Sequence, residues 1–287
     1  MIPAQFEYAR ANTLDEAVSL LAQNEDAKIL AGGHSLIPAM KLRLAMPPML
    51  IDIARIKDLS YISEEAGQIR IGAMTTHYQI ESSDLLKNIC PLLPECASHI
   101  GDMQVRNKGT IGGSVAHSDP AGDWPAAILA LDAELVAVSK AGERIIKAGE
   151  FFVDLLTTSL EPSEILREIR ITKPQGRSGH AYVKMPHPAS GFAVVGVAAT
   201  LSFNGGSKCK SATIGITGVS SKAYRAAGVE SALAGANLDD NAIAAASSHA
   251  TDAIDVNGDV FASDEYRRHL AAVYTRRAIA AAVQNAR

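Results

Sequence analysis

Two short glycine-rich segments stand out as places where this 287-residue chain could hold an anion. Residues 31–35 read Ala-Gly-Gly-His-Ser and residues 109–114 read Gly-Thr-Ile-Gly-Gly-Ser. Glycine allows unusual backbone angles and close approach to a ligand, and exposed N–H groups at the start of a helix favour phosphate. Neither segment has the spacing of a Walker A loop or of the Rossmann Gly-x-Gly-x-x-Gly motif. Each alone also fits a plain tight turn, but the pair predicts a pyrophosphate held from two sides.

Polar side chains near the second segment add to this interpretation. Thr110 and Ser114 offer hydroxyl groups, and Asp123 suits a ribose hydroxyl because a carboxylate accepts charge-assisted hydrogen bonds. Asp123 could equally cap the helix expected over 124–131. Arg106 and Lys108 could neutralise a diphosphate or form a solvated positive face.

Composition excludes several classes of function. The net charge is −4, so there is no basic excess for a nucleic-acid backbone, and aromatic residues make up only 5% of the chain. Three cysteines without a Cys-x-x-Cys pair disfavour zinc or an iron–sulfur cluster held by this chain alone, and predict buried thiols in a reducing cytoplasm. No signal peptide and no apolar run of about 20 residues is present, so stable membrane insertion is not expected.

The elements that must position the two segments follow from hydrophobic periodicity and turn residues. Thr13 and Glu16 form a capping-box pattern ahead of a helix, and Ala141-Gly142 marks a hairpin between strands 136–139 and 144–147. Further strands are expected at 27–31, 49–53, 69–73 and 164–172, and further helices at 35–44, 75–81 and 92–100. The intervening stretch 101–123 reads as a polar, glycine-punctuated loop.

The pattern changes after 173–179, a stretch rich in proline, glycine and charge that we interpret as a linker. Strands are expected at 182–184, 192–203 and 208–219, with Asn204-Gly205-Gly206 as a hairpin turn. The chain beyond residue 226 is alanine-rich and reads as helical, and its last helix is expected over 263–285. The length is consistent with two domains.

Taken together, these residues resemble a known family. The Ala-Gly-Gly-His-Ser and Thr-Ile-Gly-Gly motifs and Asp123, at these separations, are similar to the FAD-binding medium subunit of the molybdenum hydroxylases, the xanthine dehydrogenase and carbon monoxide dehydrogenase family. The opening Met-Ile-Pro, the run Ile-Gly-Ala-Met-Thr-Thr at 71–76 and the closing Glu-Tyr-Arg-Arg at 265–268 fit the same pattern. The similarity extends along the whole chain.

The resemblance implies an α+β fold. A two-lobed α/β domain of the FAD-binding PCMH type (named after p-cresol methylhydroxylase) would occupy residues 1–176, with lobes at about 1–56 and 57–176. A C-terminal domain over 177–287 would hold a three-stranded antiparallel sheet and helices. FAD would lie between the lobes and be bound non-covalently.

The resemblance also implies a set of cofactor-binding residues. Besides the motifs, Ile100, Gly101 and Val105 would line the cofactor, Asp123 would bind the ribose, Leu166 would form an apolar wall, and Lys184 would reach the flavin or adenine region. The complete set is Lys28, Ile29, Leu30, Ala31, Gly32, Gly33, His34, Ser35, Leu36, Ile100, Gly101, Val105, Gly109, Thr110, Ile111, Gly112, Gly113, Ser114, His117, Asp123, Leu166 and Lys184. No catalytic acid or base and no metal ligand is implied in this chain.

By the same resemblance, this chain is an oxidoreductase subunit that works only in a complex. A large subunit would hold molybdopterin, a small subunit would carry [2Fe–2S] clusters, and the assembly would be a dimer of such heterotrimers. This chain would pass electrons from the clusters through FAD to an acceptor. Residues 184–192 depart from the Arg-x-x-Gly-Asp-Tyr stretch of many relatives and end in Phe192, so substrate and acceptor stay open.

Two alternative functions remain open at this point. One is a self-sufficient FAD oxidoreductase of the same fold, with His187 and Lys184 as candidate groups above the flavin. The other is a nucleotide-binding module without redox activity.

Overall fold

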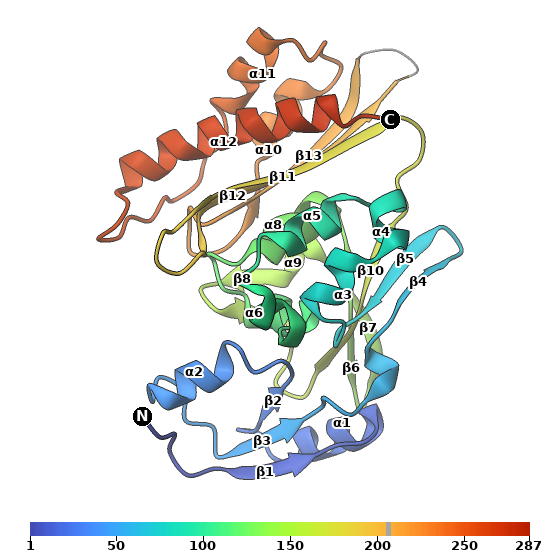
Figure 1. The fold of residues 1–287 in the computed structure, drawn as a ribbon, viewed down its shortest axis with the longest axis vertical. Coiled ribbons are helices and arrows are strands. Elements are labelled where there is room, and N and C mark those ends of the chain that lie inside the picture. The colour runs from blue at the N-terminus through green and yellow to red at the C-terminus, as the bar shows by residue number, and fades with distance from the viewer. Residues whose placement is uncertain (205–207) are drawn as a thin grey trace.

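A computed structural model describes residues 1–204 and 208–287. Three sheets follow one another along the long axis of the molecule, in chain order from the bottom to the top of Figure 1. A separate two-stranded hairpin, β8 (Phe152–Asp154) with β9 (Thr157–Thr158), lies beside the middle sheet. The fold is therefore mixed α and β, as predicted.

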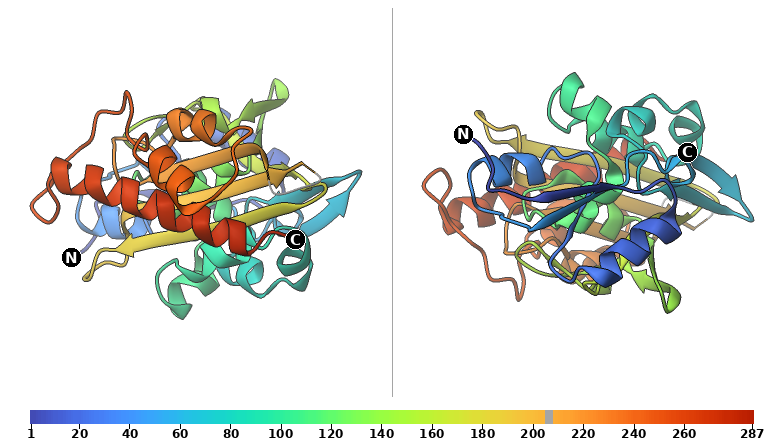
Figure 2. Two further views of the ribbon diagram at one scale, coloured as in Figure 1. Left: turned by 90° about the horizontal axis from the view of Figure 1, so that it is seen from above. Right: turned by 90° about the horizontal axis from the view of Figure 1, so that it is seen from below.

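The first sheet is parallel and has the strand order β1-β3-β2. Thr13 caps its helix α1 by accepting a hydrogen bond from the Glu16 N–H, and Ala17, Val18 and Leu21 of that helix are buried in the core beneath the sheet. Figure 2 (right) shows this helix below the strands. The elements are β1 (Glu7–Arg10), α1 (Leu14–Gln23), β2 (Lys28–Leu30), α2 (Leu36–Lys41) and β3 (Met49–Asp52).

The middle sheet is antiparallel, with the order β4-β5-β10-β6-β7. Gly142 starts the second strand of the predicted hairpin at φ +117°, which explains the glycine there. A short 3₁₀ helix (Lys57–Leu59) precedes the sheet. Its strands are β4 (Ile62–Glu65), β5 (Gln68–Gly72), β6 (Glu134–Ser139), β7 (Gly142–Lys147) and β10 (Ile165–Thr172).

Seven helices of the described chain lie between the first and last strands of this sheet and bury the largest hydrophobic core with it. Helix α8 is buried at every residue from Asp123 to Ala130. The helices are α3 (His77–Ser82), α4 (Asp84–Ile89), α5 (Leu92–Ser98), α6 (Met103–Lys108), α7 (Ile111–His117), α8 (Asp123–Ala130) and α9 (Ala148–Phe151).

The stretch 101–123 is not the loop that the sequence predicts, because it contains α6 and α7. Asp102 and Thr110 cap these helices through hydrogen bonds from the N–H groups of Val105 (2.8 Å) and Gly113 (3.2 Å). The glycines in α7 come from packing: a Cβ on Gly112 would lie 2.4 Å from the Cβ of Ala73. Glycine disfavours an isolated helix, but here tertiary contact outweighs propensity.

The last sheet is antiparallel and has four strands, one more than predicted, in the order β11-β12-β13-β14. The fourth is a two-residue strand, too short to show a pattern in sequence. Of the predicted hairpin turn, Gly205 and Gly206 lie outside the described residues. The strands are β11 (Ser178–Pro186), β12 (Ala193–Phe203), β13 (Cys209–Thr217) and β14 (Tyr224–Arg225).

This last sheet lies between two sets of helices. Helix α8 packs so closely on one face that a Cβ on Gly215 would lie 2.0 Å from the Ala126 carbonyl oxygen. Helix α12 crosses the other face (Figure 2, left), next to the short helices that follow β14 in the chain. These helices are α10 (Ala227–Leu233), α11 (Asp240–Ser247) and α12 (Asp264–Gln284). Across residues 1–204 and 208–287, no helix is long and apolar enough to cross a membrane.

Candidate functional site

The two glycine motifs lie directly against each other. A Cβ on Gly32 would lie 2.5 Å from the Lys108 carbonyl oxygen and 2.8 Å from the Cα of Gly109. A Cβ on Gly113 would lie 3.4 Å from the Cβ of Ala31. The structure therefore brings together two segments that are more than 70 residues apart in the chain, and Gly32 is required for their contact.

The first motif leaves a row of backbone donors free. It follows β2 and turns at Gly33, which has φ +75°, into α2. The Gly33 carbonyl accepts a hydrogen bond from the Ile37 N–H at 3.0 Å. The backbone N–H groups of residues 32–35, in contrast, have no acceptor among the described residues. Consecutive unpaired N–H groups beside a helix start form a concave site for an anion. The predicted anion cradle fits this motif.

The second motif is different, because its N–H groups are already used. Ile111 donates to the Thr75 carbonyl at 3.0 Å and Gly112 to the Ala73 carbonyl at 2.9 Å. Gly113 and Ser114 donate to the hydroxyl and the carbonyl of Thr110. The N–H groups of 111–114 are therefore not free for a ligand, and those of Ile111 and Gly112 fasten α7 to the β5–α3 connection.

Hydroxyl groups are what the second motif retains for a ligand. The Ser114 side chain is half-buried and has no hydrogen-bond partner in the part of the chain that the structure describes. The Thr110 hydroxyl accepts from Gly113 and keeps its own proton to donate. The second motif thus supplies hydroxyl groups and close packing, while the first supplies N–H groups.

The residues expected to line the cofactor ahead of the second motif form one small unit. Gly101 has φ +49°, and a Cβ on it would lie 2.9 Å from the Val105 side chain. Arg106 donates to the carbonyls of Ile100 and Gly101, each at 3.1 Å, and to Glu81 at 2.7 Å. Arg106 is thus engaged by the protein, which disfavours its use in neutralising a diphosphate.

Asp123 does not cap α8. Gly122 is the N-cap residue and Asp123 is the first residue inside the helix, where its buried carboxylate accepts from the Tyr182 hydroxyl (2.5 Å) and from Lys184. Burial raises the pKa of Asp123, while the Lys184 ammonium and the Tyr182 hydroxyl oppose that rise. A role in ribose binding stays a prediction, and it would use a carboxylate that already holds two donors.

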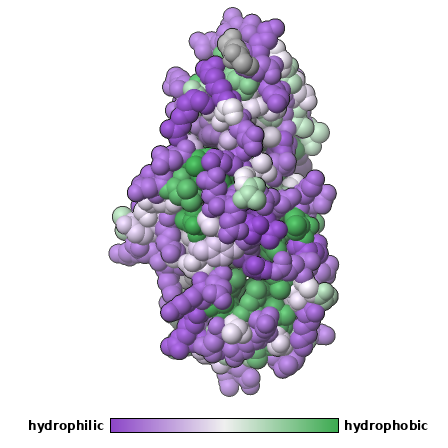
Figure 3. Space-filling model, turned by 90° about the vertical axis from the view of Figure 1, so that its right-hand side faces the viewer, coloured by the Kyte–Doolittle hydropathy of each residue, from purple (hydrophilic) through white to green (hydrophobic). Residues whose placement is uncertain are grey.

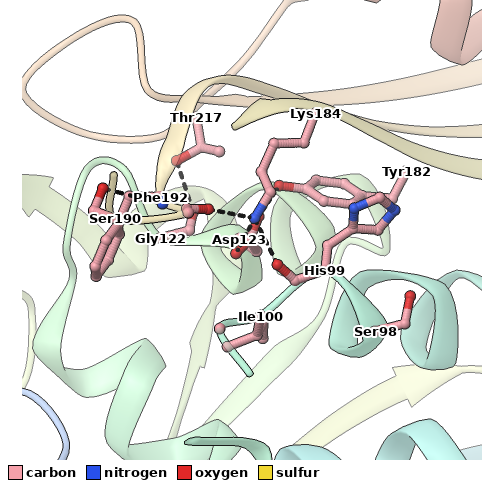
Figure 4. A network of polar contacts seen from close by, with 12 residues as sticks. Ser98, His99, Ile100, Gly122, Asp123, Tyr182, Lys184, Ser190, Phe192 and Thr217 are labelled. Atoms are coloured by element: carbon pink, nitrogen blue, oxygen red, sulfur yellow. Dashed lines mark hydrogen bonds and ion pairs between the residues drawn. The ribbon is translucent and has the colours of Figure 1, made fainter. Parts of the chain in front are cut away.

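Lys184 joins three segments of the chain (Figure 4). Its ammonium lies 2.9 Å from Asp123 and donates to the carbonyls of His99 (2.7 Å) and Gly191 (2.9 Å). The side chain is only 2% exposed, and an ammonium has three N–H donors. All three have protein partners, so Lys184 fixes the β11–β12 turn to the start of α8 and the end of α5.

The segment 119–122 before α8 is held by the C-terminal sheet. Thr217 donates to the carbonyls of Pro120 (2.7 Å) and Gly122 (2.8 Å), and Ala193 donates to the Ala121 carbonyl at 3.0 Å. Sequence reasoning missed this brace, because its partners are more than 70 residues apart and carry no motif.

A buried pair beneath the second motif was also missed. Trp124, fully buried as expected for a packing residue, donates its indole N–H to Nδ1 of His77 at 3.0 Å. The His77 backbone N–H donates to the Gly109 carbonyl at 3.0 Å. Burial, helped by the charges of His34 and Arg106, lowers the pKa of His77 to about 4. The only signal in sequence is a histidine at the start of a helix.

The remaining candidates are spread around the motifs. Leu166 is buried in the core at a bulge of β10, and His117 ends α7. Lys28 is exposed at the start of β2, and Leu36 is half-buried at the start of α2.

The groups named for a self-sufficient enzyme do not form an acid–base pair. Nδ1 of His187 accepts from the N–H groups of Ala189 and Ser190, and its ring packs at a tilt of 57° against Phe261, with centroids 4.4 Å apart. Lys184 has no free donor. The three cysteines are free and buried, as expected, and within residues 1–204 and 208–287 no cluster of His, Cys, Asp or Glu could hold a metal ion.

Comparison with known proteins adds the family. The models for the FAD binding domain in molybdopterin dehydrogenase and for the CO dehydrogenase flavoprotein C-terminal domain match residues 4–174 and 180–282. The carbon monoxide dehydrogenase medium chain of Afipia carboxidovorans is 40% identical over 284 residues, which are 97% of each chain. Two solved structures match almost end to end. Carbon monoxide dehydrogenase of Hydrogenophaga pseudoflava is 39% identical, with a TM-score of 0.97 and 100% of both chains covered. Quinoline 2-oxidoreductase of Pseudomonas putida 86 is 33% identical, with a TM-score of 0.93 and 99% of both chains covered.

The fold and the paired motifs define the FAD-carrying component of an oxidoreductase. The chain belongs to the FAD-binding medium subunits of the molybdenum hydroxylases, the family of the carbon monoxide dehydrogenase medium chains.

Proposed function

We propose that this chain carries FAD and relays electrons within a molybdenum hydroxylase. The observation that carries the proposal is the row of four unpaired N–H groups at 32–35, packed against the second motif in a chain of this family. FAD, when bound, supplies the chemistry of accepting and releasing electrons, and the protein supplies position and electrostatics.

The chain's own groups fit the diphosphate of FAD. The N–H groups of Gly32 to Ser35 would hold its oxygens, with the hydroxyls of Thr110 and Ser114 on the other side. We propose the predicted set of 22 residues, from Lys28 to Lys184, as the cofactor-binding residues. Within that set, the contacts of Asp123 and Lys184 support a role in fixing the wall of the site.

We also propose the division into residues 1–176 and 177–287. The two family models meet between residues 174 and 180, and β11 begins at Ser178. The brace of 119–122 by the last sheet supports a function for the second domain, because it holds the start of α8 and thus Asp123 in place.

The partners follow from the family. We propose a large molybdopterin-binding subunit and a small [2Fe–2S] subunit, assembled as a dimer of heterotrimers in the cytoplasm; the three free thiols fit that compartment. Several large hydrophobic side chains stay exposed, among them Met1, Ile2, Leu44 and Val260. Figure 3 shows the face on the right-hand side of Figure 1, where hydrophobic patches lie within a mostly hydrophilic surface. Such patches suit subunit contacts.

The substrate of the complex is left open by this chain. Its relatives belong to enzymes named for carbon monoxide and for quinoline, and we propose that the substrate is oxidised in the molybdopterin-binding subunit.

The test has two arms. The full chain, purified with the subunits that accompany it, should contain one FAD per chain, and acid or heat should release that FAD into the supernatant. The separated chain should be reduced by dithionite but not by purines, aldehydes or N-heterocycles. FAD that stays on the denatured chain, or direct reduction by an organic substrate, would refute the proposal.

A further inference from the structure

His77 has a hydrogen-bond donor that the protein itself does not use. The residue is 4% exposed, and its Nδ1 accepts the indole N–H of Trp124 at 3.0 Å. An indole nitrogen can only donate, so Nδ1 carries no proton and the ring proton lies on Nε2. Across residues 1–204 and 208–287, no acceptor lies within hydrogen-bond reach of Nε2. Nε2 is not among the fully covered side-chain atoms that lack a partner, so this nitrogen can be reached by a ligand.

The unused donor faces the junction of the two motifs. Nε2 would lie 2.7 Å from a Cβ on Gly109, so any side chain at this position would cover it. On its other side, Gly109 contacts Gly32, which begins the row of unpaired N–H groups. Gly109 therefore has a second purpose besides close packing: it leaves Nε2 uncovered.

We propose that His77 is an additional cofactor-binding residue, whose Nε2–H donates to an anionic oxygen of the FAD diphosphate. The inference rests on the proposed function and adds a third segment to its two motifs. A neutral donor suits this place, because Arg106 is engaged by Glu81 and the second motif has few free N–H groups. Trp124 is then the positioning residue, since it fixes the tautomer of the imidazole.

Two substitutions separate this role from a structural one. In His77→Asn the amide oxygen lies close to where Nδ1 was and can accept from Trp124, but the donor at Nε2 is lost. In His77→Gln the amide nitrogen reaches close to the Nε2 position and keeps the donor. His180→Asn is the matched control: His180 is also buried, but it lies on β11 beside Thr200.

The experiment measures the affinity of the flavin-free protein for FAD and for ADP, with the full chain purified together with its accompanying subunits. Loss of one hydrogen bond to a charged group weakens ligand affinity by roughly 10-fold to 100-fold. His77→Asn should weaken FAD and ADP by that factor, while His77→Gln and His180→Asn stay within a few fold of the parent. ADP serves as the probe because it carries the diphosphate without the flavin.

Other outcomes would overturn the inference. If His77→Asn binds FAD and ADP like the parent, or if His77→Gln loses more affinity than His77→Asn, then Nε2 does not contact the diphosphate. His77 would then serve only as the hydrogen-bond acceptor of Trp124. If His77→Asn does not fold, the rate of deuterium exchange at Cε1 of His77 is measured in the parent instead. This rate should fall when ADP binds, and an unchanged rate would refute the contact. A parent that binds no FAD at all would instead refute the proposed function.

Discussion

The two glycine motifs look alike in sequence but differ in what their backbones do. In 32–35 the N–H groups have no protein acceptor in the described chain, and Gly33 sits at φ +75°. In 109–114 most N–H groups are bonded within the protein, and the glycines allow close packing: Gly109 on His77, Gly112 on Ala73 and Gly113 on Ala31. One motif is open toward a ligand and the other is a packing device that brings hydroxyls and the first motif together.

This difference shows why a glycine pattern alone does not specify a phosphate site. Glycine is needed wherever two backbones come close as well as where a backbone meets a ligand. Which of the two applies depends on where the N–H groups go, and this is decided by residues distant in the chain, here Ala73 and Thr75. Substitutions in the two motifs should therefore have different effects on stability and on binding.

The largest effect is expected for Gly112→Val. Its Cβ would lie 2.6 Å from the Ala73 carbonyl oxygen and 2.7 Å from the Ala73 Cα, and this backbone cannot move without disturbing β5. We expect a loss of more than about 3 kcal/mol in the free energy of unfolding. Denaturant unfolding of the flavin-free protein measures it, with Gly149→Val as control, since Gly149 has open space around it. Equal stability of the two variants would contradict the packing role.

Acid should destabilise the fold through two buried histidines. Burial lowers the pKa of His77 and of His180 to about 4, whereas an unfolded histidine titrates near 6.5. Between these values the unfolded chain binds more protons, so this stabilisation is complete above about pH 6.5 and is lost as the pH falls to 4. Each histidine accounts for about 3 kcal/mol over that range.

The measurement for this prediction is the free energy of unfolding at pH 7, 6 and 5. His77→Gln and His180→Asn should each show a shallower decline with acid than the parent. If both variants follow the parent curve, neither histidine is held neutral by the fold. His77 lies beneath the second motif and His180 in the last sheet, so the pair compares the two regions directly.

Much of the fold could be predicted from local patterns. The Thr13 cap, the hairpin at Gly142 and the long strands of the last sheet all follow from periodicity and turn chemistry. Helix α7 could not be predicted, because its first turn contains Gly112-Gly113 and tertiary contacts, among them the one between Gly112 and Ala73, stabilise it. Local propensity is overridden there by packing, which sequence periodicity does not report.

The candidate site divides in the same way. The motifs were found from the chemistry of their residues, and the structure brings them into contact. The surroundings of Asp123 could not be predicted, because a helix cap and a buried ion pair have the same sequence signature: an acidic residue before an apolar helix. Its partners Tyr182 and Lys184 come from a strand about 60 residues later. Long-range partners of this kind are set by the tertiary fold.

A smaller effect is expected for Gly33→Ala in the first motif. Alanine at positive φ costs about 1–2 kcal/mol, and its Cβ would meet the Ile37 side chain at 3.1 Å, which is able to shift. The turn should relax and misalign the free N–H groups, so we expect roughly tenfold weaker FAD binding with most of the stability retained. FAD titration and unfolding are measured on the same sample. A variant that loses stability but binds FAD like the parent would contradict an open, ligand-facing motif.

The smallest effects separate the two hydroxyls of the second motif. Thr110 caps α7 through Gly113, so Thr110→Ala should lower the free energy of unfolding by about 1 kcal/mol. Ser114 has no protein partner in the described chain, so Ser114→Ala should leave stability unchanged and weaken FAD binding only a few fold, the effect of losing one hydrogen bond. Unfolding and FAD titration of both variants give the comparison. If Ser114→Ala destabilises the fold and leaves FAD binding unchanged, then the second motif is a packing device alone, and the whole anion site lies in 32–35.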